Sequence, residues 1–285
     1  MTGLPDVPNS AVPGSTRASS APKPGPRPGP EQLVSLLDDA ASAFRQQIAS
    51  LTDADVRAPS GLPDWSRGHV LAHVAGVANG MARQLEYAAR GETIDLYDGG
   101  ADGRNRAIEE GSVRGADRQR ADLDTALDRA LVAFHRLGES DWSVPISYRD
   151  GVVRDGGLAL WRELVIHLTD LNVGVEADSW TPLFCEHLFG FLAARVPSDL
   201  RLSVQPFGMA PRILANASET GATATATATA AAARSRTVSV NGMATDIAAW
   251  LAGRNPNLGS LRAEAAADGV ELPTLLPWPS ALPAK

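Results

Sequence analysis

Four stretches in the first 174 residues repeat apolar side chains at helical spacing, and this pattern limits the possible folds more than any other feature. The four stretches are residues 31–51, 69–91, 121–138 and 156–174. Asp64 or Ser66 is expected to cap the second one, because both residue types accept hydrogen bonds at a helix start. Each stretch presents one apolar stripe that another element must cover, so the pattern predicts a four-helix bundle.

The rest of the chain divides into segments of different composition. Residues 1–30 are rich in Pro, Gly and Ser and poor in large apolar residues, which predicts a disordered tail. We assign the bundle to residues 31–178, a smaller α+β domain to 179–272 and an irregular tail to 273–285. The link between the second and third helices, residues 92–115, is long enough to carry function.

The pattern changes after about residue 182. We expect a helix over 182–196, short strands at 200–207, 211–217 and 236–242, and a further helix over 243–253. An Ala/Thr-rich run at 222–233 has low complexity and is placed in a loop between strands. The predicted fold class is therefore an α-helical bundle followed by a small α/β domain.

Charge and cysteine content exclude several classes of partner. The chain has 26 basic and 33 acidic residues and a net charge of −7, which argues against nucleic acid or an anionic membrane surface as a partner. Cys185 is the only cysteine, so no intrachain disulfide forms, which fits a reducing compartment. We find no apolar run near the about 18 residues that span a bilayer and no leader pattern, so we expect a cytoplasmic protein.

Two pairs of polar residues interrupt the apolar stripes. His69 and His73 are four residues apart in the second helix, and Glu163 and His167 are four apart in the fourth. Residues at that spacing share one side of a helix, so one histidine of the first pair can meet the second pair if the helices are adjacent. Two nitrogens and one carboxylate suit Zn²⁺ and leave a fourth position open. The alternative is a pair of ordinary solvent-exposed contacts worth about 0.2–0.5 kcal/mol each.

Three other candidates have simpler interpretations. His135 lies in the last turn of the third helix, where the helix dipole favours a cation. His187 is interpreted as structural. Cys185 lies in an apolar helix and is interpreted as core packing rather than as a nucleophile.

Four blocks of sequence carry a resemblance to a known family. They are DWSRGHVLAHVAGVANGM, YDGGADGRNRAIEEG, WRELVIHLTDL and AAWLAGR. In this order they resemble the mycothiol-dependent maleylpyruvate isomerase family, a branch of the DinB-like metal-binding bundles, over roughly residues 31–260. The resemblance implies an N-terminal bundle that holds a divalent metal, usually zinc, and a smaller α/β domain.

The resemblance also implies site residues. The family's metal ligands fall on His73, Glu163 and His167, so His73 rather than His69 is the ligand. Arg104, in the long link, and Arg254, in the C-terminal domain, match active-site arginines, and Arg104 would also contact the cofactor. The planar forks of these arginines suit the two carboxylates of the substrate.

The reaction implied by the resemblance is the conversion of maleylpyruvate to fumarylpyruvate with mycothiol as the thiol cofactor. A thiolate adds to the double bond, the resulting single bond rotates, and elimination restores the trans alkene. A metal that coordinates the thiol deprotonates it, and Arg104 would stabilise the enolate. The chain then needs no cysteine of its own.

Other functions fit the same sequence. A mycothiol S-transferase would use the same metal-activated thiol on a different electrophile. A non-catalytic binding module would bind no metal, and a metal-dependent hydrolase would work without a thiol. In each case we expect a monomer.

Overall fold

The structure is a computed structural model, and it describes residues 27–216, 236–256, 261–264 and 272–279. Most of the segment predicted to be a disordered tail, residues 1–26, lies outside the described residues, as does the Ala/Thr-rich run at 222–233. None of the helices within the described ranges is both long and apolar enough to cross a membrane.

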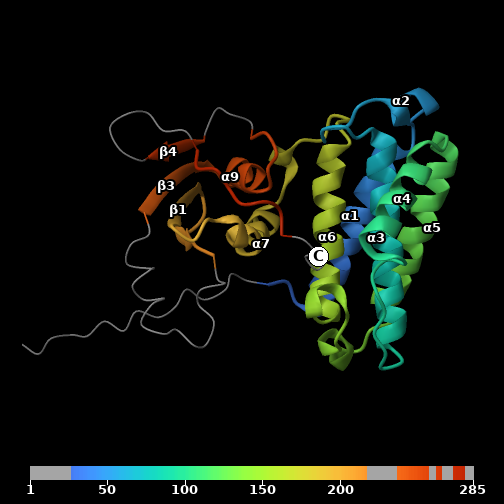
Figure 1. Ribbon diagram of the computed structural model, residues 1–285. Helices are drawn as coiled ribbons and strands as arrows, with labels where there is room; N and C mark the ends of the chain where they lie inside the picture. Colours follow the sequence, from blue (N-terminus) through green and yellow to red (C-terminus); the bar gives the residue numbers. More distant parts are fainter. Residues whose placement is uncertain (1–26, 217–235, 257–260, 265–271, 280–285) are drawn as a thin grey trace, which may run out of the picture.

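The N-terminal part of the described chain is a helical bundle (Figure 1). Its helices are α1 (Pro30–Ile48), α2 (Asp53–Arg57), α3 (Arg67–Ala88), α4 (Gly100–Ser112), α5 (Ala116–His135) and α6 (Val153–Asp170). The four predicted helices correspond to α1, α3, α5 and α6, and each of them packs against two of the others. The predicted bundle is therefore confirmed.

The apolar stripes become the core of this bundle. On α1 the buried residues follow the helical period: Leu33, Leu37, Ala41, Phe44 and Ile48. Burying a side chain such as leucine or phenylalanine contributes about 1.5–3 kcal/mol, so this stripe alone holds α1 firmly against α5 and α6. Of the two predicted caps of α3, Ser66 is the one found: its side chain accepts a hydrogen bond from the backbone N–H of His69.

Helix α4 lies in the segment that was predicted only as a long link. The sequence did not predict this helix because it has almost no apolar stripe: Ile108 is its one large buried side chain. It packs closely on α3 through small residues. A Cβ at Gly111 would lie 2.7 Å from the Cβ of Ala72, and a Cβ at Gly68 would lie 2.4 Å from the carbonyl oxygen of Ser112. This close approach holds the end of α4 against the first two turns of α3.

The C-terminal region combines two helices with a small sheet (Figure 1). In chain order it contains α7 (Pro182–Leu192), β1 (Leu200–Phe207), β2 (Arg212–Leu214), β3 (Arg236–Met243), α9 (Ala244–Leu251) and β4 (Arg262–Glu264). The strand order is β2-β1-β3-β4, with β1 and β3 parallel and the outer pairs antiparallel. The three predicted strands and both helices are present, and β4 is an additional strand.

The two regions meet along α6. Trp161 on α6 packs edge-on against Phe184 of α7, with ring centroids 4.9 Å apart. Residues 272–279 form no helix or strand. Arg195 holds this segment with two hydrogen bonds: its side-chain Nε donates to the carbonyl of Leu276, and its backbone carbonyl accepts from the N–H of Leu276. This segment brings Trp278 back toward the bundle.

Candidate metal and substrate site

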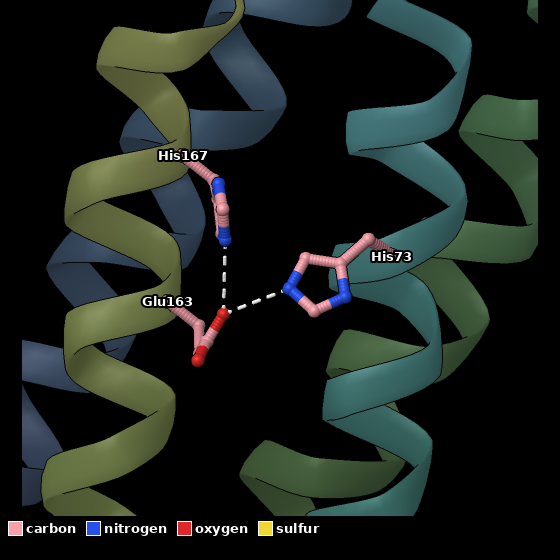
Figure 2. Close-up of side chains that lie close together, drawn as sticks. All are labelled: His73, Glu163 and His167. Carbon is pink, nitrogen blue, oxygen red and sulfur yellow. Dashed lines mark hydrogen bonds and ion pairs between the residues drawn. The ribbon is translucent and has the colours of Figure 1, made fainter. Parts of the chain in front are cut away.

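Three polar side chains meet between α3 and α6. Nε2 of His73 and Nε2 of His167 each lie 3.0 Å from the same carboxylate oxygen, Oε2 of Glu163 (Figure 2). One ligand atom from each residue lies within 4.8 Å of the others. His73 and His167 are buried, whereas the side chain of Glu163 is 27 % exposed. The structure thus brings together the three residues that the sequence resemblance implied as ligands.

The other histidine of α3 points elsewhere. Nδ1 of His69 accepts a hydrogen bond from the backbone N–H of Ser66 at 3.2 Å, and so completes the cap of α3. Its ring stacks on Trp65. One residue of the pair therefore fixes the helix start, and His73, one turn later, faces α6.

Hydrogen bonds control the protonation of the cluster. Burial alone would raise the pKa of Glu163, but the hydrogen bonds from His167 and His73 outweigh it and hold the pKa well below its usual value. Burial opposes a charged His167, yet its contacts with Asp170 and Glu163 raise its pKa to about 9. Burial lowers the pKa of His73. Without a cation, a proton on His167 therefore balances the carboxylate.

Asp170 connects the cluster to the C-terminal region and was not singled out from the sequence. Its Oδ2 lies 2.8 Å from Nδ1 of His167 and 2.6 Å from Nη2 of Arg254, and its Oδ1 accepts from Nε of Arg254 at 3.0 Å. These contacts outweigh the effect of burial and lower the pKa of Asp170 to about 2. The i, i+3 spacing from His167 is the signal that would have revealed it.

Arg254 therefore reaches the site, but all three nitrogens of its guanidinium already donate hydrogen bonds. Two of its nitrogens bind both oxygens of Asp170, and the third donates to the carbonyl of Ala252 at 2.7 Å. The role predicted for Arg254 was to bind a substrate carboxylate. In the structure the guanidinium pairs with Asp170, and the role in substrate binding stays a prediction.

Arg104 reaches the cluster from α4. Its Nη2 lies 3.2 Å from Nδ1 of His73, and its Nη1 donates to Asn105 at 3.0 Å. A guanidinium only donates, so Nδ1 of a neutral His73 accepts and Nε2 carries the proton. Tyr97 lies beside Arg104, and burial together with the charge of Glu163 raises the pKa of its hydroxyl to about 12. The hydroxyl therefore keeps its proton.

These groups line one cavity of about 350 Å³. Its polar lining includes the His73, Glu163 and His167 cluster, together with Arg104 and Arg254. Its apolar lining comes from both regions of the molecule: Val77, Met81, Leu96, Ile166 and Trp278. A cavity of this size, with few polar groups in an apolar wall, is typical of a small-molecule site.

The donor set fits a divalent cation. In a tetrahedral zinc site with bonds near 2.0–2.1 Å, neighbouring ligand atoms are about 3.4 Å apart, close to the spacing of this cluster. Asp170 holds the far nitrogen of His167, which is the usual second contact of a metal-bound histidine. The residues present therefore match the chemistry of Zn²⁺ or a similar ion.

The remaining candidates have structural surroundings. His135 pairs with Asp38 at 3.0 Å on the surface of the bundle. Cys185 is fully buried, and burial raises its thiol pKa to about 12. His187 accepts a hydrogen bond from Arg162 at 2.9 Å, and burial with two nearby arginines lowers its pKa to about 3.

Comparison with known proteins supports this description. Residues 37–172 match the family model of the mycothiol maleylpyruvate isomerase N-terminal domain. A solved structure of the mycothiol-dependent maleylpyruvate isomerase aligns with a TM-score of 0.71 at 21% identity, covering 87% of this chain and 96% of the other. A histidine-to-alanine variant of that enzyme aligns over the same shares at 0.70 and 20% identity. No curated protein matches the sequence.

The fold and site define the class of protein first: a helical bundle with a His–Glu–His cluster that could hold a metal ion, joined to a small α/β region, with a pocket between them. The bundle, over residues 37–172, matches the family model of the mycothiol maleylpyruvate isomerase N-terminal domain. The family resemblance seen in the sequence is thereby confirmed. The solved structures show that the shared fold extends into the C-terminal region.

Proposed function

We propose that this protein is a cis–trans isomerase of the maleylpyruvate type that depends on a divalent metal and on mycothiol. One observation carries the proposal: His73, Glu163 and His167 converge in a pocket that Arg104 also lines, within a bundle of the matching family. The proposed substrate is a small cis-configured keto acid that carries carboxylates. Neither nucleic acid nor a membrane surface has a part in it.

The proposed ligands of the metal are the two histidines and Glu163. When bound there, a divalent cation would lower the pKa of a thiol and supply the nucleophile that a free thiol near pKa 8.5 provides only in small amount. The residues of the chain then need to bind the substrate, hold its charge and keep water out.

Arg104 is the proposed group that stabilises negative charge on the substrate. Its present contact with Nδ1 of His73 requires that nitrogen to accept. A histidine that gives Nε2 to a cation carries its proton on Nδ1, so it no longer accepts from Arg104. With a cation held at Nε2 of His73, Arg104 would have a donor free for the pocket, where it would stabilise a developing enolate.

Tyr97 and the apolar wall complete the proposed site. The hydroxyl of Tyr97 stays protonated, because its pKa is raised to about 12, and so offers a neutral donor beside Arg104. Val77, Met81 and Ile166 line the pocket with apolar surface. Such a wall limits water, which strengthens the interaction of Arg104 with a charged substrate.

We assign Arg254 a positioning role. Through Asp170 it fixes the ring of His167 with Nε2 facing Glu163. Contacts of this kind set the orientation and basicity of a metal-binding histidine. This role requires the C-terminal region, which explains how a separate region contributes to a site built on the bundle.

The test combines metal content with thiol-dependent turnover. We expect the purified full-length protein to contain about one divalent ion per chain and to isomerise maleylpyruvate only when mycothiol is added. Replacing His73, Glu163 or His167 with alanine is expected to remove the metal and lower turnover at least about 100-fold. Metal analysis and the absorbance of the enol form give the two readings.

His69→Ala is the matched control, because His69 lies one turn from His73 on the same helix but outside the cluster. It should keep its metal and its turnover. Full metal occupancy in all three cluster variants would disprove the proposed site. Consumption of mycothiol would indicate an S-transferase instead, and activity without a thiol would indicate a hydrolase.

A further inference from the structure

Arg162 is a buried cation in the same pocket, and it has no part in the function proposed above. It precedes Glu163 on α6, lines the pocket and is only 6 % exposed. Its Nη1 donates to Nε2 of His187 at 2.9 Å, and its Nη2 lies 3.4 Å from the hydroxyl of Tyr148. Its guanidinium lies 3.7 Å from the ring centre of Phe191. All of these partners are uncharged.

Within the described ranges no carboxylate forms an ion pair with Arg162, although the charge of the adjacent Glu163 acts on it. The neighbouring Glu163 directs its carboxylate at His73 and His167 instead. Among the arginines that the structure describes, Arg162 is the one buried from solvent. Arg254, in contrast, has a carboxylate partner in Asp170.

The surroundings of Arg162 add positive charge rather than remove it. The guanidinium of Arg149 lies 5.2 Å from the ring centre of Phe191, the same ring that Arg162 covers. The charge of Arg27 also acts on His187 and helps to keep that histidine neutral. Burial lowers the pKa of Arg162, but a guanidinium remains protonated at neutral pH. The end of the pocket at Arg162 is therefore cationic.

A buried charge without a counterion is costly, by several kcal/mol in typical proteins. An anion that enters the pocket would relieve this cost and form charge-assisted hydrogen bonds, which are about twice as strong as neutral ones. The guanidinium is already held in place by His187, Tyr148 and Phe191, so little ordering is needed on binding.

We propose that Arg162 is the carboxylate-binding residue of this pocket and that the pocket accepts ligands that carry a carboxylate at its Arg162 end. The proposal rests on the proposed function for the identity of the reaction, but anion binding at Arg162 requires neither metal nor thiol. It replaces Arg254, whose fork is occupied by Asp170, as the partner of a substrate carboxylate.

The experiment measures binding of maleate, a cis-dicarboxylate, by titration calorimetry to the full-length protein, before and after treatment with a chelator. Arg162→Met removes the charge and the fork, and we expect it to weaken maleate binding by about 10- to 100-fold in both states. Arg162→Lys keeps the charge without the fork and should lie between the two. Circular dichroism confirms that each variant is folded.

Arg149→Gln is the matched control, because Arg149 is exposed and lies over the same ring. It should change the affinity for maleate by less than about threefold. Two further probes complete the design. Maleamide, which has the same shape as maleate but no charge, should not bind measurably. Inorganic phosphate, an anion without a carboxylate, should bind more weakly than maleate.

An affinity of Arg162→Met for maleate within twofold of the unsubstituted protein would overturn the proposal, as would an equal loss in Arg149→Gln. Phosphate binding as tight as that of maleate would overturn the assignment to carboxylates. Because no thiol or turnover is involved, loss of maleate binding in Arg162→Met supports the proposal even if isomerisation is never observed. Active isomerisation combined with unchanged maleate binding would disprove this proposal alone.

Discussion

The helical bundle and the C-terminal region meet at the pocket, but they supply different kinds of groups. The bundle provides the three clustered side chains on α3 and α6, and it also provides Arg104 and Arg162. The C-terminal region provides Arg254, which acts through Asp170, and Trp278, which forms part of the wall. His187, on α7, holds Arg162 in place.

The difference shows how the work is divided. The bundle supplies all three residues of the cluster, since His73, Glu163 and His167 belong to α3 and α6. The C-terminal region orients two of the bundle's side chains, His167 through Asp170 and Arg162 through His187. Its sheet serves as a support that carries these contacts.

The largest expected effect comes from breaking the contact between Asp170 and Arg254. Asp170→Asn leaves Arg254 without its counterion and weakens the support of His167. We expect the metal affinity to fall about 10- to 100-fold. The free energy of unfolding should fall by about 3 kcal/mol, because a buried ion pair loses one partner. Metal titration and urea denaturation measure the two effects.

A double-mutant cycle sharpens the same comparison. If the two regions communicate through this pair, Arg254→Gln should cost less in a protein that already carries Asp170→Asn than in the unsubstituted one. The expected interaction energy is about 1–3 kcal/mol. Additive effects of the two substitutions would show that Arg254 acts on the site in some other way.

A smaller effect is expected from the neutral histidine of α7. Burial and the charges of Arg162 and Arg27 lower the pKa of His187 to about 3, while an unfolded histidine titrates near 6.5. Between these values the unfolded chain binds more protons, so stability is lost as the pH falls below 6.5. His187 should contribute about 1 kcal/mol of this loss per pH unit.

Urea denaturation at pH 6 and pH 5 tests this expectation against His187→Gln. The glutamine keeps an acceptor for Arg162 but does not titrate. The substituted protein should therefore lose less stability over that interval than the unsubstituted one. Equal slopes would mean that His187 is protonated in the folded state, which would also remove the acceptor of Arg162.

The smallest effect on function is expected at Cys185. This thiol is buried, and its pKa is raised to about 12, so it should not react with a thiol reagent until the protein unfolds. Cys185→Ala should leave thiol-dependent isomerisation unchanged within twofold and reduce stability by about 1 kcal/mol. Loss of turnover would show that the chain supplies a thiol of its own.

The four long helices were predictable because each has an apolar stripe that only burial against other helices satisfies. Helix α4 was not, because its polar sequence carries little such signal and its position depends on close contacts at Gly68 and Gly111. Strand β4 was missed for a similar reason: its three residues gain their structure from pairing with β3.

The sequence by itself determined that the first half would be a bundle and that Glu163 and His167 would share one helix face, because both follow from the period of the α-helix. Its resemblance to a family singled out His73. Only the tertiary structure decided which arginines are neutralised and which are not. Asp170 and Arg254 are 84 residues apart, and Arg162 meets His187 25 residues later. Whether a charge has a partner at such separations depends on how the helices pack, and no local pattern records it.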